Sequence, residues 1–379
     1  MRLACLQENL KRGLAIVSHA VASRSTLPVL SNILLSTENG RLRLAANNLE
    51  ISITVLVGAR IDEDGAVTVP AKLLTDLIGN LPNDTVELEL DGRTQTLTVL
   101  CRGTKAAIKG IEADEFPAVP VIDAQAEPLA LLPPGMLREV IGQVALAAAA
   151  EHTNPILQGV LLRLSGTRAT FAAIDGYRLA VRTIELPEPA RETVDIVIPA
   201  RALTELGRTL GDTDEPVAML VTNNNSQVIF HTDMVDFVSR VIDGKFPDYE
   251  RFVPQATPDT TRTVLTTDEL LKAVKRVALF SQAAGNIVTL SMEGRAGQPG
   301  RLTLSATANE VGETLEQVDA LLDGEGGKLA LNVKYLQEAL SVINSDQVAL
   351  ETQSPNSPGV FRPVGGPDYL HLVMPMRIP

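Results

Sequence analysis

The chain has 379 residues, of which 45% are apolar and 21% are charged, and this composition suits two or three packed domains. Its longest apolar runs, such as 144–150, are too short to span a bilayer, and the first residues lack the apolar core of a secretory signal. Cys5 and Cys101 are the only cysteines, which excludes a disulfide framework and predicts a reducing cytoplasm. The formal net charge of −13, taken over the whole chain, argues against a nucleic-acid partner.

Six segments carry apolar residues at helical spacing, and runs with strand character lie between them. Helices are expected over 10–22, 71–81, 136–150, 200–210, 267–281 and 333–344. In the first third of the chain, strands are expected over 33–36, 41–46, 50–57, 66–69, 85–90, 95–101 and 104–111. In the second third they are expected over 157–164, 168–173, 178–184, 193–198, 216–221, 226–231 and 235–241. Near the end, 353–368 is rich in Pro and Gly and predicts a loop around a short strand, and a final strand follows over 369–374.

The order of these elements repeats three times. The second helix of each repeat begins with a basic residue, Lys72, Arg201 or Lys334. These three residues are 129 and 133 positions apart. Each unit also closes on an apolar residue followed by proline. Recurring landmarks in one order indicate three copies of one domain, expected at 1–124, 125–255 and 256–379. We therefore predict an α+β fold in which each copy packs two helices on about eight antiparallel strands.

The negative charge is unevenly distributed. The six helical windows contain ten Lys or Arg against six Asp or Glu, a net charge of +4, which leaves −17 for the rest of the chain. Charge on a single helix is usually its solvated face, but the same bias in all three copies favours contact with a phosphate backbone. An aromatic content of 3% without tryptophan disfavours base stacking on single strands.

Catalytic motifs are missing from the sequence. It has no phosphate-binding loop, HExxH or GxSxG pattern, and its four histidines stand singly. Asp175 and Tyr177 could act as an acid with a tyrosine, but they occupy a turn position that is filled by 48–49 in the first copy and by 308–309 in the third. A tight turn is the simpler interpretation. Two alternatives stay open: a carbohydrate or nucleotide hydrolase that brings a second carboxylate to Asp175, and a protein-binding scaffold without a nucleic-acid role.

Five short motifs stand in order along the chain: 24–28 (RSTLP), 69–72 (VPAK), 175–180 (DGYRLA), 244–249 (GKFPDY) and 373–377 (VMPMR). Together they resemble the bacterial DNA sliding clamp family, the beta subunit of DNA polymerase III, over the whole chain. The resemblance implies a head-to-tail homodimer that forms a six-domain ring around duplex DNA, with helices lining the hole. It also implies a cytoplasmic, cofactor-free and non-enzymatic processivity factor. Its partners would be an ATP-driven clamp loader, the replicative polymerase and other replication and repair proteins.

The family resemblance carries specific residues with it. It implies that Arg24 and Lys72 contact DNA. The exposed faces of the basic helices add seven further candidates, namely Lys11, Arg12, Arg201, Lys272, Lys275, Arg276 and Lys334. Relatives can carry aromatic residues on the loop after the third helix, where this chain has Thr153, Asn154, Pro155 and Ile156, so a DNA contact from 152–156 is left open.

The resemblance further implies a groove that binds short linear peptides, with a glutamine and two or three apolar side chains as the expected pattern. Its residues would be Leu157, Ile174, Gly176, Tyr177, Arg178, Leu179, Pro247, Arg251, Phe252, Val373, Met374, Pro375, Met376 and Arg377. Methionine suits such a surface because its flexible side chain adapts to varied partners. At the dimer interface the resemblance implies Leu279 and Phe280, facing Ala106, which stands where some relatives place an aromatic residue. The sequence predicts no metal site.

Overall fold

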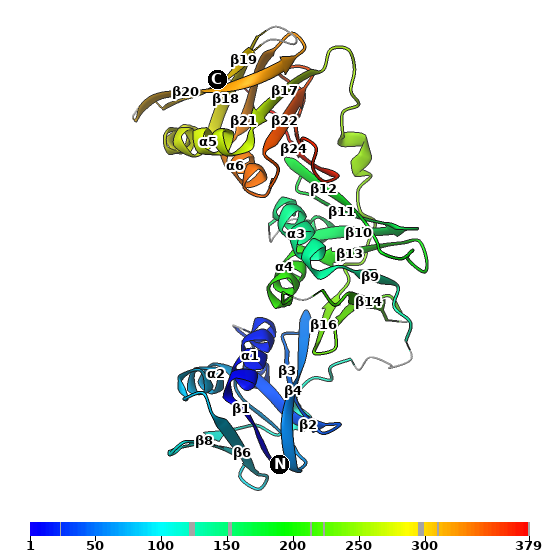
Figure 1. The fold of residues 1–379 in the computed structure, drawn as a ribbon, viewed down its shortest axis with the longest axis vertical. Helices are drawn as coiled ribbons and strands as arrows, with labels where there is room; N and C mark the ends of the chain where they lie inside the picture. Colours follow the sequence, from blue (N-terminus) through cyan, green and yellow to red (C-terminus); the bar gives the residue numbers. More distant parts are fainter. Residues whose placement is uncertain are drawn as a thin grey trace. The chain divides into compact units, whose positions relative to one another are not determined.

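The computed structural model describes residues 1–22, 24–120, 126–150, 154–212, 214–222, 224–294, 299–308 and 311–377. Within these residues one series of elements occurs three times: a strand, a helix, four strands, a second helix and three strands (Figure 1). This confirms the predicted α+β fold of three tandem copies, each with two helices and eight strands in the described part of the chain.

The elements of the first copy are β1 (Arg2–Leu6), α1 (Gln7–Val17), β2 (Asn32–Glu38), β3 (Arg41–Asn47), β4 (Ile51–Glu63), β5 (Ala66–Pro70), α2 (Ala71–Asn80), β6 (Thr85–Asp91), β7 (Thr96–Cys101) and β8 (Thr104–Lys109). Those of the second are β9 (Ala130–Leu132), α3 (Pro134–Val144), β10 (Gly159–Ser165), β11 (Arg168–Ile174), β12 (Arg178–Glu185), β13 (Val194–Pro199), α4 (Ala200–Thr209), β14 (Val217–Val221), β15 (Gln227–His231) and β16 (Val235–Arg240). Those of the third are β17 (Thr261–Thr266), α5 (Thr267–Ser281), β18 (Ile287–Glu293), β19 (Pro299–Ala308), β20 (Gly312–Asp323), β21 (Gly327–Asn332), α6 (Val333–Ser341), β22 (Gln347–Thr352), β23 (Gly359–Pro363) and β24 (Tyr369–Val373).

The helices lie where the apolar periodicity predicts them, but four ends differ by three or more residues: both ends of α1, the end of α3 and the end of α6. Helix α1 ends at Val17 instead of residue 22, and α6 ends at Ser341 instead of residue 344. Helix α1 begins at Gln7 rather than at Leu10, because the Gln7 side chain is buried and donates a hydrogen bond to the Ile78 carbonyl oxygen at 2.7 Å. Helix α3 ends at Val144, although the apolar run continues to Ala150; Ala145–Ala147 form a short 3-10 turn after it. Strand β1 was not predicted, and it lies between β4 and β6 in the sheet.

All strand pairs are antiparallel among the described residues, and long strands connect the two halves of the outer copies. Strand β4 has 13 residues, so one end pairs with β3 and the other with β1. Strand β20 has 12 residues and joins β19 to β17 in the same way. Strand β12 of the second copy has only eight residues and pairs with β11 and β24.

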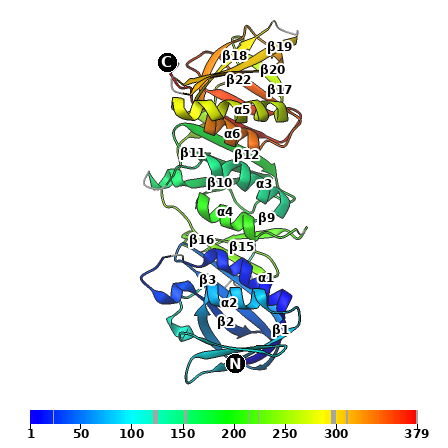
Figure 2. The same cartoon turned by 90° about the vertical axis from the view of Figure 1, so that its left-hand side faces the viewer.

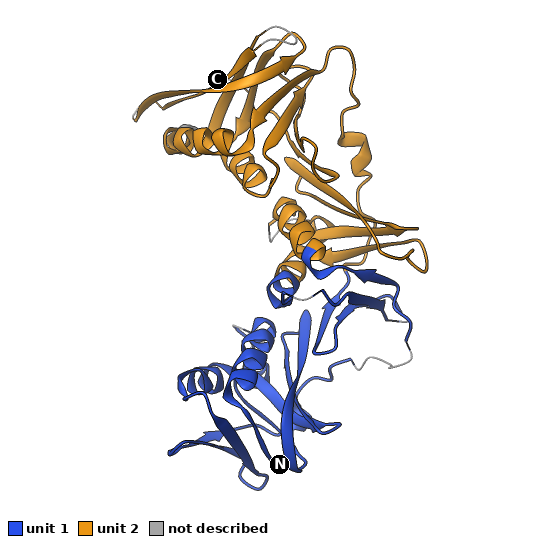
Figure 3. Ribbon diagram, viewed as in Figure 1, with its two compact units in different colours: residues 1–135, 205–241 blue, residues 136–204, 242–379 orange. Residues whose placement is uncertain are grey.

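The second copy is therefore shared between two compact units, which Figure 3 colours separately. The first unit comprises 1–135 and 205–241, where β16 extends the first copy's sheet by pairing with β4. The second comprises 136–204 and 242–379, where β12 pairs with β24. These units do not follow the predicted domain ends, which remain predictions; the end at 124 lies outside the described residues.

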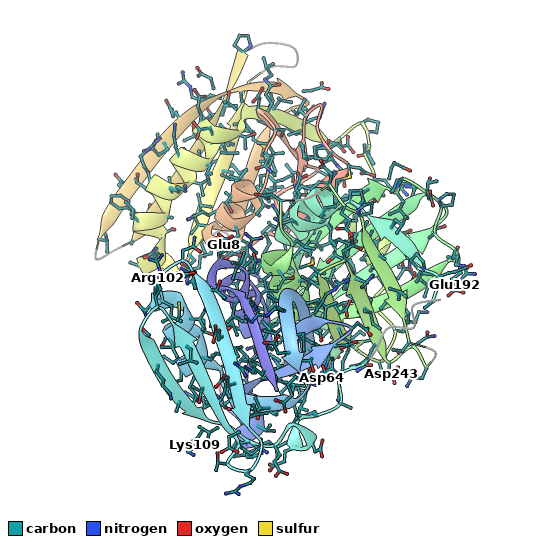
Figure 4. The ribbon with its side chains drawn as sticks, turned by 60° about the horizontal axis from the view of Figure 1, so that its bottom comes forward. Glu8, Asp64, Arg102, Lys109, Glu192 and Asp243 are labelled. Carbon is teal, nitrogen blue, oxygen red and sulfur yellow. The ribbon has the colours of Figure 1, made fainter. Side chains whose placement is uncertain are left out.

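Within each unit the helices cover one face of the strands, and the views in Figures 1 and 2 agree on this arrangement. In the second unit α5 packs on β19, β20 and α6 through its buried stripe of Leu270, Val274 and Val277. In the first unit α1 packs on β3, β4 and α2 through Leu10, Leu14 and Val17. Most charged side chains lie on the outside, and the six that Figure 4 labels are all exposed: Glu8, Asp64, Arg102, Lys109, Glu192 and Asp243.

Candidate functional site

The turn between β11 and β12 is the best-defined part of the predicted groove. The Asp175 Oδ1 atom accepts hydrogen bonds from the backbone N–H groups of Tyr177 at 2.8 Å and Arg178 at 3.0 Å. Gly176 adopts the left-handed conformation, with φ of 91°, which glycine tolerates without steric cost. This is an Asx turn, so local structure accounts for the Asp175 carboxylate.

Arg178 holds that turn against the third copy. Its Nε atom donates to Asp175 Oδ2 at 3.0 Å, its Nη1 atom binds Glu338 on α6, and its guanidinium lies 4.4 Å from the ring centroid of Tyr335. The Arg178 side chain is only 10% exposed. Because its charge already has these internal partners, we regard Arg178 as a wall of the groove; binding of a peptide by its guanidinium stays a prediction.

The end of the chain runs beside this turn. Strand β24 pairs with β12, with Val373 opposite Arg178 and Leu372 opposite Leu179. The pairing continues past the strand, since the Met374 N–H donates to the Tyr177 carbonyl oxygen at 2.8 Å. The Met376 N–H donates to the Ala330 carbonyl oxygen on β21, also at 2.8 Å. Val373 and Met374 therefore lie beside Arg178 and Tyr177, whereas Met376 lies beside β21; a role of this segment in peptide binding stays a prediction.

The apolar residues of the groove fall into a buried floor and an exposed rim. Ile174 and Leu179 belong to a buried cluster with Phe246 and Tyr249, and the half-buried Leu157 packs against it. At the rim, Tyr177, Phe252 and Met374 keep 64%, 50% and 40% of their surface exposed. A surface that exposes large apolar side chains over an ordered apolar floor is typical of a site that binds apolar groups.

The remaining groove residues flank this floor. Pro247 follows the buried Phe246, and Arg251 and Phe252 lie in a short 3-10 helix whose first residue, Tyr249, belongs to the apolar cluster. The Arg251 side chain is exposed and pairs with Asp248 at 2.6 Å. Arg251 thus remains accessible from solvent, which suits its predicted contact with an acidic flank.

The nine predicted DNA-contacting cations are all exposed. Eight lie on helices, on the face opposite each buried stripe, and Arg24 lies in the connector after α1. On α5 the exposed Lys272, Lys275 and Arg276 form one stripe. The structure therefore leaves these side chains free of the core, and their contact with DNA stays a prediction.

Acidic side chains partly neutralise the α5 stripe. Arg276 donates to both carboxylate oxygens of Glu316 on β20, at 2.8 and 2.6 Å, and Lys272 pairs with Asp268 at 2.6 Å. The hydrogen bond to Glu316 raises the pKa of Arg276, and the bond from Arg276 lowers the pKa of Glu316. Lys275 makes no ion pair within the described residues, so it is the unpaired cation of this stripe.

The predicted interface residues have different surroundings. Leu279 on α5 is 70% exposed, and Phe280 beside it is half-buried. Ala106 is half-buried on β8, the strand at one end of its sheet. An apolar side chain as exposed as Leu279 is consistent with an interface, and the assignment stays a prediction.

The described residues of the loop after α3 contribute to the fold of this chain. Residues 152 and 153 lie outside the described residues. Asn154 Oδ1 accepts from the Ile156 N–H at 3.3 Å, which caps a 3-10 turn, and Ile156 packs on the apolar cluster of the groove.

The sequence did not identify Tyr335 and Glu338 as neighbours of the groove. Both lie on α6, more than 150 positions from Arg178, and no local pattern marks such a contact. Among the described residues no group of His, Cys, Asp or Glu side chains could hold a metal ion. None of the helices in that part of the chain has the length and apolar character to cross a membrane.

Comparisons with known proteins agree along the whole chain. Family models of the DNA polymerase III beta subunit match in three segments: the N-terminal domain over 1–120, the central domain over 131–248 and the C-terminal domain over 251–377. A beta sliding clamp of Synechocystis sp. is 34% identical over the full length of both chains. The DNA polymerase sliding clamp of Bacillus subtilis has a TM-score of 0.92 at 26% identity, over 100% of this chain and 99% of that one. The DNA polymerase III subunit beta of Pseudomonas aeruginosa has a TM-score of 0.90 at 29% identity, over 100% of both chains.

Proposed function

Since this chain belongs to the DNA polymerase III beta subunit family, the bacterial beta sliding clamps, we propose that it is a processivity factor that encircles duplex DNA without catalytic activity of its own. Two copies would pair head to tail into a ring of six domains, with the helices facing the DNA. The ring would act in the cytoplasm and tether the replicative polymerase and other replication and repair proteins.

The observation that carries this proposal is the placement of the cations. An acidic chain with a net charge of −13 presents its exposed helical Lys and Arg opposite the buried stripes, in all three copies. A ring holds DNA by topology, so weak phosphate contacts that slide are sufficient, while an acidic exterior disfavours binding of DNA elsewhere.

The groove of the second compact unit would capture the partners. Its ordered floor of Ile174 and Leu179 would receive the apolar side chains of a linear peptide, and the adaptable Met374 would close over them. Arg251 would meet an acidic flank of the peptide. Ring closure would bury Leu279 and Phe280 against the edge of the first copy that contains Ala106.

Retention on closed DNA tests the topological claim. The protein is placed on nicked circular duplex by the clamp loader and ATP, separated from free protein, and the circle is then cut at one restriction site. We expect the protein to stay on the circle at moderate salt and to be lost from the linear product. Equal retention on both forms would contradict encirclement and favour ordinary surface binding, whereas no retention on either would favour the scaffold alternative.

The hydrolase alternative has a separate test. Asp175 is held by two backbone N–H groups and by Arg178, whose other partner is Glu338, so its carboxylate is engaged as a turn element. Asp175→Asn should keep the turn, because an amide oxygen can accept the same two bonds, and DNA retention should persist. Hydrolytic activity that this variant abolishes would support the alternative instead.

A further inference from the structure

The first compact unit repeats the turn that borders the groove. Asn48 Oδ1 accepts from the N–H groups of Glu50 at 3.0 Å and Ile51 at 2.9 Å, as Asp175 Oδ1 does from Tyr177 and Arg178. The residue after Asn48 is Leu49, and its φ of 73° matches the left-handed conformation of Gly176. The two turns therefore share one backbone conformation.

The neighbouring strand is also repeated. Strand β16 pairs with β4 so that Ser239 lies opposite Ile51, as Val373 lies opposite Arg178 in the second unit. One position further, the Arg240 N–H donates to the Glu50 carbonyl oxygen at 3.0 Å, which corresponds to the bond from Met374 to Tyr177. The main-chain frame of the groove thus occurs a second time, with different side chains.

A cavity of about 170 Å³ lies in this frame, and its lining includes Leu49, Glu50, Pro117, Gln227, Val238 and Arg240. We call it the first-junction pocket. An apolar cavity of about 150 Å³ suffices to bind benzene, so this pocket has room for one aliphatic side chain. Pro117 follows the buried Phe116, as Pro247 follows Phe246 beside the groove.

Leu49 is an unusual residue for its position. A left-handed backbone is unfavourable for leucine, because Cβ crowds the following carbonyl oxygen, and the related turn has glycine there. Burial does not explain the leucine either, since 45% of its surface is exposed. A strained residue that presents an apolar side chain to solvent at the mouth of a cavity points to a binding role.

Charge distinguishes this pocket from the groove. Glu50 and Arg240 are exposed, face each other across the strand pair, and make no ion pair within the described residues. Tyr177 and Met374, both apolar at the rim, hold these places in the second unit. An arginine beside a small pocket that has Leu49 and Val238 in its wall fits a carboxylate next to an aliphatic side chain, and Glu50 can accept a peptide N–H.

We propose that the first-junction pocket is a second peptide site, which binds an extended segment carrying one aliphatic side chain followed by a carboxylate. This inference rests on the proposed function, because the groove of the second unit serves as its template. The two sites differ in chemistry, so a partner with both kinds of segment could engage both.

The test uses the full-length protein with methyl-labelled leucine and valine, and the probe is the capped peptide acetyl-Gly-Leu-Asp-Gly-amide. A matched peptide with Asn in place of Asp is the control ligand. The Leu49 and Val238 signals report on the first-junction pocket, and the Leu157 and Leu179 signals report on the groove. Two variants introduce the residue found at the corresponding position of the groove. Arg240→Met introduces the residue type of Met374, and Leu49→Gly introduces that of Gly176.

We expect the probe to shift the Leu49 and Val238 signals with a dissociation constant on the order of millimolar. The Asn peptide and the Arg240→Met variant should each weaken binding about fivefold, the effect of one exposed ion pair. Leu49→Gly should remove binding as seen at Val238 while the other methyl signals keep their positions, since glycine relieves the backbone strain. Shifts confined to Leu157 and Leu179, equal binding of both peptides, or no shift at Leu49 and Val238 would each overturn the proposal.

A glutamine-containing apolar peptide is titrated in parallel. If that peptide shifts the Leu157 and Leu179 signals while the acidic probe shifts none, peptide binding by the groove is supported and peptide binding by the first-junction pocket is refuted. If the acidic probe shifts the Leu49 and Val238 signals while the glutamine peptide leaves those of Leu157 and Leu179 unchanged, peptide binding by the groove is refuted and peptide binding by the first-junction pocket is supported.

Discussion

The guanidinium of Arg178 lies over the ring of Tyr335, 4.4 Å from the ring centroid, and so connects a turn of the second copy to a helix of the third. The same side chain pairs with Asp175 and with Glu338. The Arg178 guanidinium thus contacts one residue of its own copy and two residues of the third copy. Helix α6, which carries Tyr335 and Glu338, also carries the predicted DNA contact Lys334. The wall of the groove and this basic helix are therefore parts of one packed assembly.

Arg178→Ala should lower the free energy of unfolding by about 1–3 kcal/mol, the usual effect of losing hydrogen bonds to a charged group. The loss should be felt because Asp175, only 11% exposed, would keep its charge without the guanidinium. Urea denaturation of the full-length protein measures the change. The control is Arg168→Ala, whose side chain is 58% exposed and should contribute about 0–1 kcal/mol. Similar effects of the two substitutions would contradict the assignment.

Met374→Ala combined with Met376→Ala should weaken binding of a peptide with one glutamine and two leucines at least about tenfold, since burying an apolar side chain contributes roughly 1.5–3 kcal/mol. The backbone bonds of both residues do not need their side chains, so the tail should stay in place. Calorimetry measures the affinity. Met234→Ala is the matched control, because Met234 is 50% exposed in the first compact unit. Unchanged affinity in the double variant would place the peptide elsewhere.

Most of the fold could be predicted from the sequence because its elements have strong local patterns. Hairpin turns such as Asn39-Gly40, with φ of 48° and 73°, are marked by their residue types. The predicted strand bounds were wrong where the apolar pattern changes within one strand. Strand β4 was expected to end at 57, because its second half is mostly exposed and lacks an apolar run, yet it continues to Glu63 by pairing with β1.

The sharing of the second copy between two units had no local signal either. It depends on strand length: β4 and β20 are long enough to connect the two halves of their copies, whereas β12 is not. A comparison of the repeats in the sequence suggests three equal copies instead. The partners of Arg178 were missed for a related reason. A repeat pattern aligns equivalent positions in different copies, whereas Tyr335 and Arg178 meet at non-equivalent ones.

Glu316→Gln should strengthen binding to linear duplex DNA, because the amide keeps only one acceptor oxygen for Arg276 and the negative charge beside the α5 stripe is removed. Affinity measured against salt concentration should show a steeper slope, by roughly one released counterion. Reversal of Lys272, Lys275 and Arg276 to Glu should impair retention on circular DNA while leaving the fold intact.

The control for both changes is Arg93→Glu, an exposed arginine in the turn after β6. It should leave the salt slope and the retention unchanged. If Arg93→Glu impairs retention as much as the triple reversal, net charge and not the α5 stripe determines DNA binding.

Leu279→Ala combined with Phe280→Ala should shift the protein toward monomer in sedimentation at micromolar concentration. Leu279 exposes 70% of its surface in the single chain, so its removal should disturb the fold little while removing apolar contact across the interface. Leu321→Ala in the same unit, 57% exposed on β20, serves as the control and should remain dimeric. A dimeric double variant would show that the contact is made by other residues.

The last prediction concerns a buried polar network between α3 and β24. The Tyr369 hydroxyl donates to the Gln143 carbonyl oxygen at 3.2 Å and lies 3.1 Å from His371 Nδ1. If the single hydroxyl proton is given to Gln143, His371 must donate through Nδ1, which leaves Nε2 without a partner among the described residues. Burial, and secondarily the charge of Arg178, lowers the pKa of His371 to about 3.

The unfolded chain binds this proton with a pKa near 6.5, so stability is fully present above that pH and is lost as the pH falls from about 6.5 toward 3. Each pH unit in this window should remove about 1.4 kcal/mol of the free energy of unfolding. His371→Gln keeps a donor for Tyr369 but cannot titrate, so its stability should fall less steeply than that of the wild type. Urea denaturation between pH 8 and pH 5 measures both slopes, and the variant should gain on the wild type below about pH 6.5. Parallel curves over the whole range would mean that His371 is not protonated on unfolding, and the network would then have no part in acid sensitivity.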